Sequence, residues 1–314
     1  MPYKTGIVVF TRQIVRRWKR TVSLIPRLTG VLALYIFYSL FRKPETHPKP
    51  FGRCSLSVGN FKDKMLNRWN LEEYEWHHVN QPTLFFGMYS LLDFFDFRFH
   101  TGQSFVFWCG SDILIFWNFS IIRGLLKKQL SKATHYCENT KEQELLKHMG
   151  IEAIICPVVL EDPANFPVTY RPNQRPDVFL SAHPDREEEY GVGLVEKIAP
   201  KVPEVTFHIY GVGGKSKHIN VMYHGRVSPE QFNKEIPSYQ AALRTNEVDG
   251  ASEIMMKSIL LGQWPITRIA YPHVSNYKNE QELIRHLKNL RFKRNPNFAS
   301  RTFYLKQKLN RTPF

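Results

Sequence analysis

Apolar and polar positions along residues 54–290 follow two patterns, short apolar runs and longer segments with apolar residues at helical spacing. The short runs predict β-strands, and the helical spacing predicts α-helices. Strands are predicted at residues 54–58, 105–109, 133–137, 151–157, 178–181, 205–210 and 220–225, and helices at residues 140–148, 190–198 and from Ser228 onward. Alternating strands and helices are typical of α/β domains with parallel sheets, which is the fold class we expect.

A polar, proline-rich segment at residues 161–177 separates two sets of these elements. A chain of 314 residues is long enough to bury two cores. We therefore expect two Rossmann-like lobes. The predicted domains are a basic, partly hydrophobic N-terminal segment with its connector (1–53), a first lobe (54–170), a second lobe (171–290) and a basic C-terminal tail (291–314).

Small and polar residues follow two of the predicted strands in the first lobe. Gly59-Asn60 follows the strand at 54–58, and Gly110-Ser111-Asp112 follows the strand at 105–109. In parallel sheets the carboxyl ends of the strands share one edge, where ligands bind in α/β folds. These turns are therefore candidate ligand contacts. A structural role for Asp112, as a turn or cap residue, is the alternative.

The stretch 239–269 contains the most informative pattern in the chain. Arg244 follows an apolar segment, and an acidic, glycine-containing loop at 247–252 leads into a helical pattern that ends at Gly262 before an apolar run at 264–266. Backbone N–H groups at a helix start can hold an anion, and Arg244 supplies positive charge beside them. An ordinary βαβ element with a capped helix is the other interpretation of this spacing.

Particular residues in this stretch resemble the donor-binding segment of GT-B glycosyltransferases of the family 4 type. They are Arg244-Thr245, Asp249-Gly250-Ala251-Ser252, Gly262 and Pro265-Ile266. Asp249 matches the acidic residue that opens the segment in that family. Lys257 stands where the family has a second carboxylate. Because of this charge reversal, a weakened or inactive enzyme is an alternative interpretation.

The resemblance implies two Rossmann-like lobes that face each other across a cleft, with the acceptor at the first lobe and a UDP- or GDP-sugar at the second. It implies retention of anomeric configuration, and neither a cofactor nor a metal. The positions assigned to catalysis are Arg244, Asp249, Lys257 and Asp112. The donor-binding positions are Arg186, Tyr190, Gly191, Lys215, Gly250, Ala251, Ser252 and Glu253, and the first-lobe cleft positions are Gly59, Asn60, Gly110 and Ser111.

The net charge of +15 comes from the two ends of the chain. Residues 1–53 carry 11 Lys or Arg and one acid, residues 291–314 carry seven and none, and residues 54–290 have a balance of −2. A specific nucleic-acid-binding protein more often carries its basic residues over a folded face. Basic ends around a near-neutral body favour an anionic membrane surface as the partner instead.

An uncharged run at residues 28–41 follows a basic segment near the N-terminus. Fourteen helical residues extend about 21 Å, less than the roughly 30 Å hydrocarbon layer, so we expect the run to lie in the membrane interface. A buried core helix of the first lobe is the alternative. Four cysteines without a C-x-x-C pair indicate a reducing compartment, and the spacing around His77-His78 does not predict a zinc site.

These observations predict a cytoplasmic glycosyltransferase, peripherally associated with the inner face of the membrane. It would transfer a sugar from a nucleotide-sugar donor to a lipid-linked or surface-glycan acceptor. The alternative is a catalytically degenerate GT-B-like protein that acts as a membrane-associated binding or assembly factor. The turn at 211–215 matches neither the dinucleotide-binding nor the P-loop pattern, so those functions are not predicted.

Overall fold

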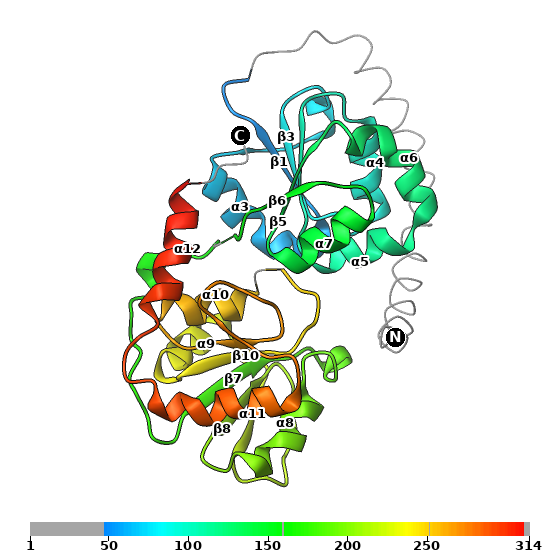
Figure 1. Cartoon of the computed structure of the whole chain (residues 1–314). Coiled ribbons are helices and arrows are strands. Elements are labelled where there is room, and N and C mark those ends of the chain that lie inside the picture. The colour runs from blue at the N-terminus through cyan, green and yellow to red at the C-terminus, as the bar shows by residue number, and fades with distance from the viewer. Residues whose placement is uncertain (1–46, 159, 251, 311–314) are drawn as a thin grey trace. The chain divides into compact units, whose positions relative to one another are not determined.

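The computed structural model describes residues 47–158, 160–250 and 252–310 (Figure 1). The predictions for residues 1–46, including the interfacial helix at 28–41, fall outside the described residues, as does Ala251. The described chain divides into two compact units. The first contains residues 47–136 and 149–153, and the second contains residues 137–148 and 154–310.

The first sheet has six strands in the order β2-β1-β3-β4-β5-β6, and the neighbouring pairs from β2 to β5 are parallel. The strands are β1 Phe51–Cys54, β2 Glu72–Glu73, β3 Thr83–Phe86, β4 Ser104–Phe107, β5 Thr134–Cys137 and β6 Ala153–Ile155. Residues in β3 and β4 are almost entirely buried, as expected for parallel strands that are covered on both faces.

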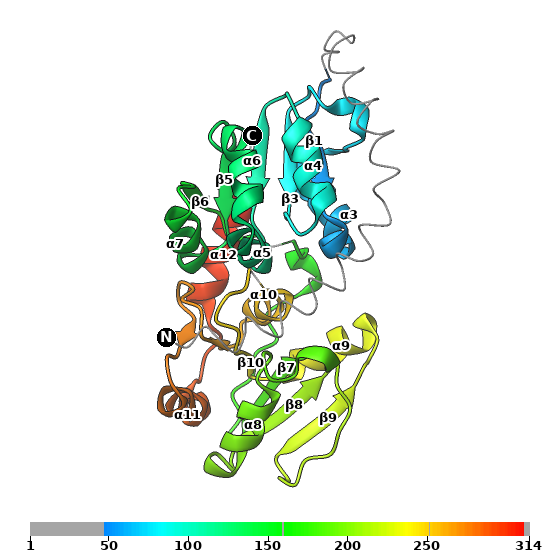
Figure 2. The same cartoon turned by 90° about the vertical axis from the view of Figure 1, so that its right-hand side faces the viewer.

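Short helices connect these strands (Figures 1 and 2). They are η1 Leu56–Phe61, α3 Lys62–Trp69, η2 Trp76–His78, α4 Leu91–Phe99, α5 Ser111–Asn118, α6 Ser120–Leu130 and α7 Thr140–His148. Helix α4 begins with a capping box, in which the Ser90 side chain accepts from the Asp93 N–H and Asp93 accepts from the Ser90 N–H. Buried aromatic residues such as Phe107, Trp108 and Phe116 fill the space between the helices and the sheet.

The structure corrects the start of the first sheet. The first strand is Phe51–Cys54, whereas residues 56–58 of the predicted strand 54–58 belong to the 3-10 helix η1, which spans Leu56–Phe61. The Ser55 hydroxyl accepts from the Ser57 N–H at 3.4 Å, and this cap turns the chain out of the sheet. Gly59 and Asn60 consequently lie exposed on η1 and do not follow a strand directly.

The second sheet also has six strands, in the order β12-β11-β10-β7-β8-β9. The strands are β7 Asp177–Ser181, β8 Thr206–Tyr210, β9 Val221–Gly225, β10 Ala241–Arg244, β11 Ile266–Thr267 and β12 Ser275–Asn276, and all neighbouring pairs are parallel. In chain order this is the 3-2-1-4-5-6 arrangement of a doubly wound sheet. The order reverses between β7 and β10, the position where such sheets bind ligands at the carboxyl ends of their strands.

The core of the second unit lies on both faces of this sheet. Its helices are α8 Val192–Ile198, α9 Pro229–Glu235, α10 Glu253–Leu260, α11 Glu280–Asn289 and α12 Phe298–Asn310, and its 3-10 helices are η3 Pro163–Asn165, η4 Pro184–Arg186, η5 Ala199–Lys201, η6 Ile236–Ser238 and η7 Leu290–Phe292. Val178 and Leu180 pack into one apolar cluster with residues of α8 and α11, while Phe179 packs into the other with residues of α10 and α12. This alternation follows from the two-residue period of a strand.

Candidate functional site

Three of the residues predicted for donor binding or catalysis, Arg244, Tyr190 and Asp249, meet at the switch point between β7 and β10. Strand β10 ends at Arg244, and the loop after β7 brings Tyr190 to the same edge of the sheet. The Arg244 Nε donates to Asp249 Oδ2 at 2.6 Å, and its guanidinium carbon lies 4.5 Å from the centroid of the Tyr190 ring. The sequence predicted Arg244, Tyr190 and Asp249 separately. The structure brings them into contact, and we call them, with the residues that bind them, the Arg244 group.

Asp249 stabilises the charged form of Arg244. Burial acts to lower the pKa of the Arg244 guanidinium, but the negative charge of Asp249 and its hydrogen bond outweigh this effect, so the pKa is raised. Only 11% of the Arg244 side chain is exposed, compared with 23% of Asp249. The guanidinium is thus a permanent cation whose orientation is fixed by a carboxylate.

Arg186 contributes a second cation at the same place. Its guanidinium binds the Glu189 carboxylate through Nε, at 2.6 Å, and through Nη2, and it lies 5.3 Å from the Tyr190 ring centroid. The Tyr190 ring therefore contacts two guanidinium groups. Such contacts are favourable because an aromatic ring has a negative face.

Two members of this group were missed by sequence analysis. Glu189 accepts from the Asn246 Nδ2 at 3.3 Å, and its backbone carbonyl accepts from the Thr245 hydroxyl at 3.2 Å. Asn246 follows Arg244 closely in the sequence, which was an available signal. Glu189 lies next to Tyr190 and three residues after its ion-pair partner Arg186, so it too had a local signal, whereas its contact with Asn246, 57 residues away along the chain, had none.

The loop after β10 is held at two carbonyl groups. The Asp249 carbonyl accepts from the Asn139 Nδ2 at 2.9 Å, and the Gly250 carbonyl accepts from the Tyr271 hydroxyl at 2.6 Å. Helix α10 then begins at Glu253, and its N-cap residue Ser252 makes no side-chain capping bond. The start of α10 is therefore not closed by the side chain that most often caps a helix.

Lys257 lies inside the second unit, only 4% exposed. Its ammonium forms an ion pair with Glu253 at 2.7 Å, one turn earlier on α10, and lies 5.5 Å and 5.8 Å from the ring centroids of Phe232 and Phe166. The structure does not bring Lys257 into contact with Arg244 or Asp249. The reversed charge is neutralised locally by Glu253, and the catalytic role stays a prediction.

The other predicted residues are placed outside the Arg244 group. Lys215 is exposed on the turn after β8. Asp112 is fully buried and accepts hydrogen bonds from the backbone N–H groups of Met88, Cys109 and Ile113. Ser111 is the first residue of α5, and Gly110 precedes it with a φ of 93°. These contacts favour the structural role for Asp112, while its role toward an acceptor stays untested.

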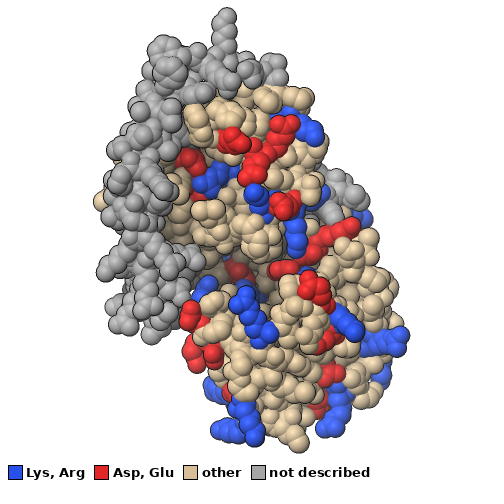
Figure 3. All heavy atoms as spheres, turned by 180° about the vertical axis from the view of Figure 1, so that it is seen from behind, with Lys and Arg blue, Asp and Glu red and all other residues tan. Residues whose placement is uncertain are grey.

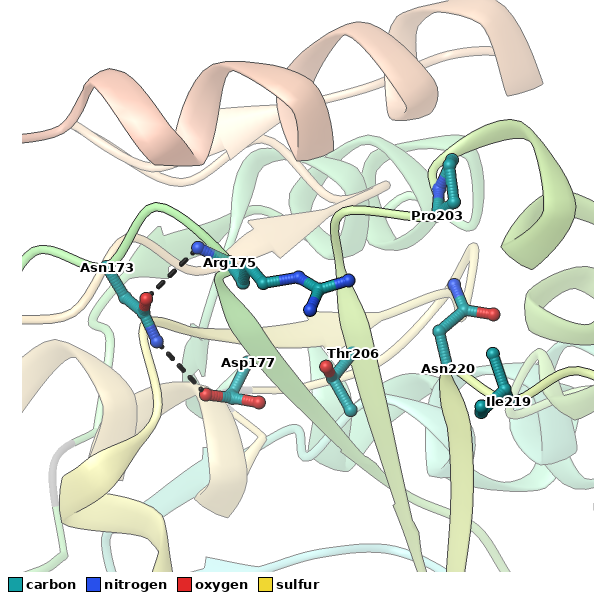
Figure 4. Close-up of a pocket in the computed structure, with 7 residues that line it drawn as sticks. All are labelled: Asn173, Arg175, Asp177, Pro203, Thr206, Ile219 and Asn220. Carbon is teal, nitrogen blue, oxygen red and sulfur yellow. Dashed lines mark hydrogen bonds between the residues drawn. The ribbon is translucent and has the colours of Figure 1, made fainter.

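A hollow of about 480 Å³ lies at the opposite, amino-terminal edge of the second sheet (Figure 4). It is lined by Asn173, Arg175, Asp177, Pro203, Thr206, Ile219 and Asn220. Asn173 donates to Asp177 at 3.4 Å and accepts from the Arg175 backbone N–H at 3.0 Å. The hollow lies at the start of β7 and β8, whereas the Arg244 group lies at the opposite ends of the strands.

Acidic and basic side chains are interspersed over the visible face of the second unit (Figure 3). Within residues 47–158, 160–250 and 252–310, no three His, Cys, Asp or Glu side chains gather so as to hold a metal ion. Across the same described ranges, none of the helices combines the length and apolar character needed to cross a bilayer.

Comparisons with known proteins identify the fold. No protein-family model matches the chain, and no curated protein matches its sequence. Among solved structures, the lipopolysaccharide outer core galactosyltransferase WaaB matches with a TM-score of 0.57 and 13% identity, over 83% of this chain and 97% of WaaB. HepE from Anabaena, in complex with UDP and glucose, matches with a TM-score of 0.54 and 8% identity, over 83% of this chain and 95% of HepE.

These matches show the GT-B fold, in agreement with the two parallel six-stranded sheets. Another match, TarM, has a TM-score of 0.48 and 13% identity and covers 73% of this chain. The chain spans 51% of the length of TarM, about half. The assignment to family 4 stays a prediction.

Gly191 is required where α8 begins beside Thr245. Its φ is +80°, and an added Cβ would lie 2.4 Å from the Thr245 Cγ2. We expect Gly191→Ala to lower the free energy of unfolding by about 2 kcal/mol or more, through left-handed backbone strain and steric overlap. Urea unfolding measures this change. Gly213→Ala is the matched control, because its Cβ would meet no atom within 4 Å, and an equal loss in both variants would contradict the prediction.

Asp112 should make stability depend on pH. Burial raises the pKa of its carboxyl to about 7, although the hydrogen bonds from backbone N–H groups act to lower it. The folded protein then holds a proton that the unfolded chain releases near pH ~4, so stability should fall as the pH rises from ~4 to ~7. Urea unfolding across this range should show Asp112→Asn gaining stability relative to the wild type as the pH rises. A difference that does not change with pH would refute the assignment.

Lys257→Glu should destabilise the protein, because it places a carboxylate beside Glu253 and against two phenylalanine rings. We expect a loss of roughly 3 kcal/mol in the free energy of unfolding. Lys257→Met keeps the apolar stem and removes the charge, so it should lose less. Chemical denaturation of both variants checks the order, and a Lys257→Glu protein as stable as the wild type would show that Lys257 is not held in this way.

Proposed function

We propose that the chain is a glycosyltransferase that uses a UDP- or GDP-sugar and transfers the sugar to a glycan or lipid-linked acceptor. The observation that carries the proposal is the contact of Arg186 and Arg244 with Tyr190 at the switch point of the second sheet. Two cations at this edge suit a diphosphate. The GT-B fold supports the same conclusion, since WaaB is a galactosyltransferase and HepE was solved with UDP and glucose.

The chemistry requires positive charge at this position. When the bond between sugar and phosphate breaks, the diphosphate gains negative charge while the sugar becomes oxocarbenium-like. Arg244 would hold the departing diphosphate, since its several N–H donors can bind phosphate oxygens while Nε stays with Asp249. The start of α10 would add backbone N–H groups beside it.

Asp249 has a positioning role in this proposal. Its carboxylate fixes the direction of the Arg244 guanidinium, and its backbone carbonyl is anchored by Asn139. Orientation before binding matters because a pre-arranged cation stabilises developing charge without a further reorganisation. We further propose retention of configuration without a bound metal, in a chain that works at the cytoplasmic face of a membrane.

Loss of the Arg244 charge should weaken nucleotide binding. We expect Arg244→Met to raise the Kd for UDP or GDP by about 10- to 100-fold, the effect of losing charge-assisted hydrogen bonds. Isothermal titration calorimetry measures the change. Arg285→Met, on the exposed side of α11, is the matched control and should bind as the wild type does.

Turnover separates the proposal from its alternative. A panel of UDP- and GDP-sugars should reveal donor hydrolysis or transfer by the wild type and its loss in Arg244→Met. Nucleotide binding without any turnover would instead identify a catalytically degenerate GT-B-like binding protein. If the wild type binds neither UDP nor GDP, both the proposed donor and the proposed binding site are wrong.

A further inference from the structure

Helix α6 presents large apolar side chains to solvent. Ile121 is 79% exposed and Leu125 is 64% exposed, and Trp117, at the end of α5, is 42% exposed. Ile121 and Leu125 are four residues apart, so they lie on the same face of the helix, and Lys128 follows at the next helical spacing. We call Ile121, Leu125 and Lys128 the outer stripe of α6.

The opposite face of α6 is fixed to the first unit. Leu126 and Leu130, on this face, are buried. At the edge beside the outer stripe, four residues after Leu125, the Gln129 side chain donates to the carbonyl of Arg98 at 3.0 Å. Arg123 donates to the carbonyls of Phe116, at 3.0 Å, and Trp117. These contacts fix the rotation of α6 about its own axis. The outer stripe therefore faces away from the packed side of the helix.

The charge along the chain segment that contains the outer stripe has one sign. Residues 113–136 contain Arg123, Lys127, Lys128 and Lys132 and no acidic residue. Lys127, Lys128 and Lys132 are exposed. This segment is part of the near-neutral body of the chain, so its local positive charge is independent of the basic ends.

We propose that the outer stripe of α6 docks on an anionic lipid bilayer. Exposed aliphatic side chains can enter the headgroup region, while neighbouring lysines reach lipid phosphates with their long apolar stems. A helix of 11 residues is too short to span a bilayer but long enough to lie on one. The combination of apolar residues with a single sign of charge favours a lipid surface, because protein interfaces are depleted in lysine.

The proposal concerns a surface of the first unit and does not depend on glycosyl transfer. It also differs from attachment through residues 1–46, since every residue of the outer stripe lies within the described chain. If the transferase proposal also holds, the lipid surface would bring the chain to a lipid-linked acceptor. Vesicle binding therefore tests this inference separately from the activity.

The experiment is co-sedimentation of the full chain with vesicles of phosphatidylcholine containing about one third phosphatidylserine. We expect Ile121→Ser/Leu125→Ser and Lys128→Glu each to weaken binding by about 10-fold, given the loss of apolar contact or the reversal of one charge. Leu56→Ser and Lys147→Glu are the matched controls, since both residues are exposed on other elements, and they should bind as the wild type does. Vesicles with brominated acyl chains should quench Trp fluorescence less in Trp117→Phe than in the wild type.

Several outcomes would overturn the proposal. Binding that is unchanged in Ile121→Ser/Leu125→Ser would show that the outer stripe does not meet the lipid. Concentration-dependent self-association that this double variant abolishes, without vesicle binding by the wild type, would identify a second copy as the occupant. A large loss of stability in the double variant, with vesicle binding retained, would mean that another part of the chain covers the outer stripe.

Discussion

The ion pair between Arg244 and Asp249 is the interaction on which the candidate site depends. A guanidinium at the end of a buried parallel strand is costly unless a carboxylate compensates for the lost water. Asp249 supplies this compensation from the loop before α10, and the Tyr190 ring centroid lies 4.5 Å from the guanidinium carbon. The pair therefore joins the end of β10 to the start of α10 and sets the geometry of the donor edge.

Close packing supports this arrangement. Gly191 lies against Thr245, while Glu189 accepts from both Arg186 and Asn246. The loop after β7 and the loop after β10 are thereby tied together across the point where the strand order reverses. Charge and packing therefore act on the same few residues.

Much of the second unit could be predicted from the sequence because its strands and helices have separate periods. Strand β8 was predicted to within one residue, and α7 was predicted with its observed bounds. Residues 83–130 were harder, because they are dense in phenylalanine and leucine, and a segment that is apolar on all sides does not reveal its period. Strand β1 was missed because it begins at Phe51, directly after a proline-rich connector.

In the candidate site, too, some residues could be predicted from the sequence and others could not. The resemblance selected Arg186, Tyr190, Gly191, Arg244 and Asp249, and the structure brings these residues together. It did not select Glu189, although this residue lies between Arg186 and Tyr190 in the sequence, and its contact with Asn246, 57 residues away, could not be predicted from that position. Lys257 was noticed for its charge, whereas its partner Glu253, four positions earlier on the same helix, was assigned to the donor instead.

The pairing of Lys257 with Glu253 constrains how this helix could change in evolution. A buried ammonium near two phenylalanine rings needs a counter-ion within reach, so positions 253 and 257 form a coupled unit. A lineage that exchanged an acid for a lysine at position 257 would have had to acquire or retain the glutamate one turn before it. Related sequences should therefore show covariation at 253 and 257, with lysine and glutamate appearing together or disappearing together.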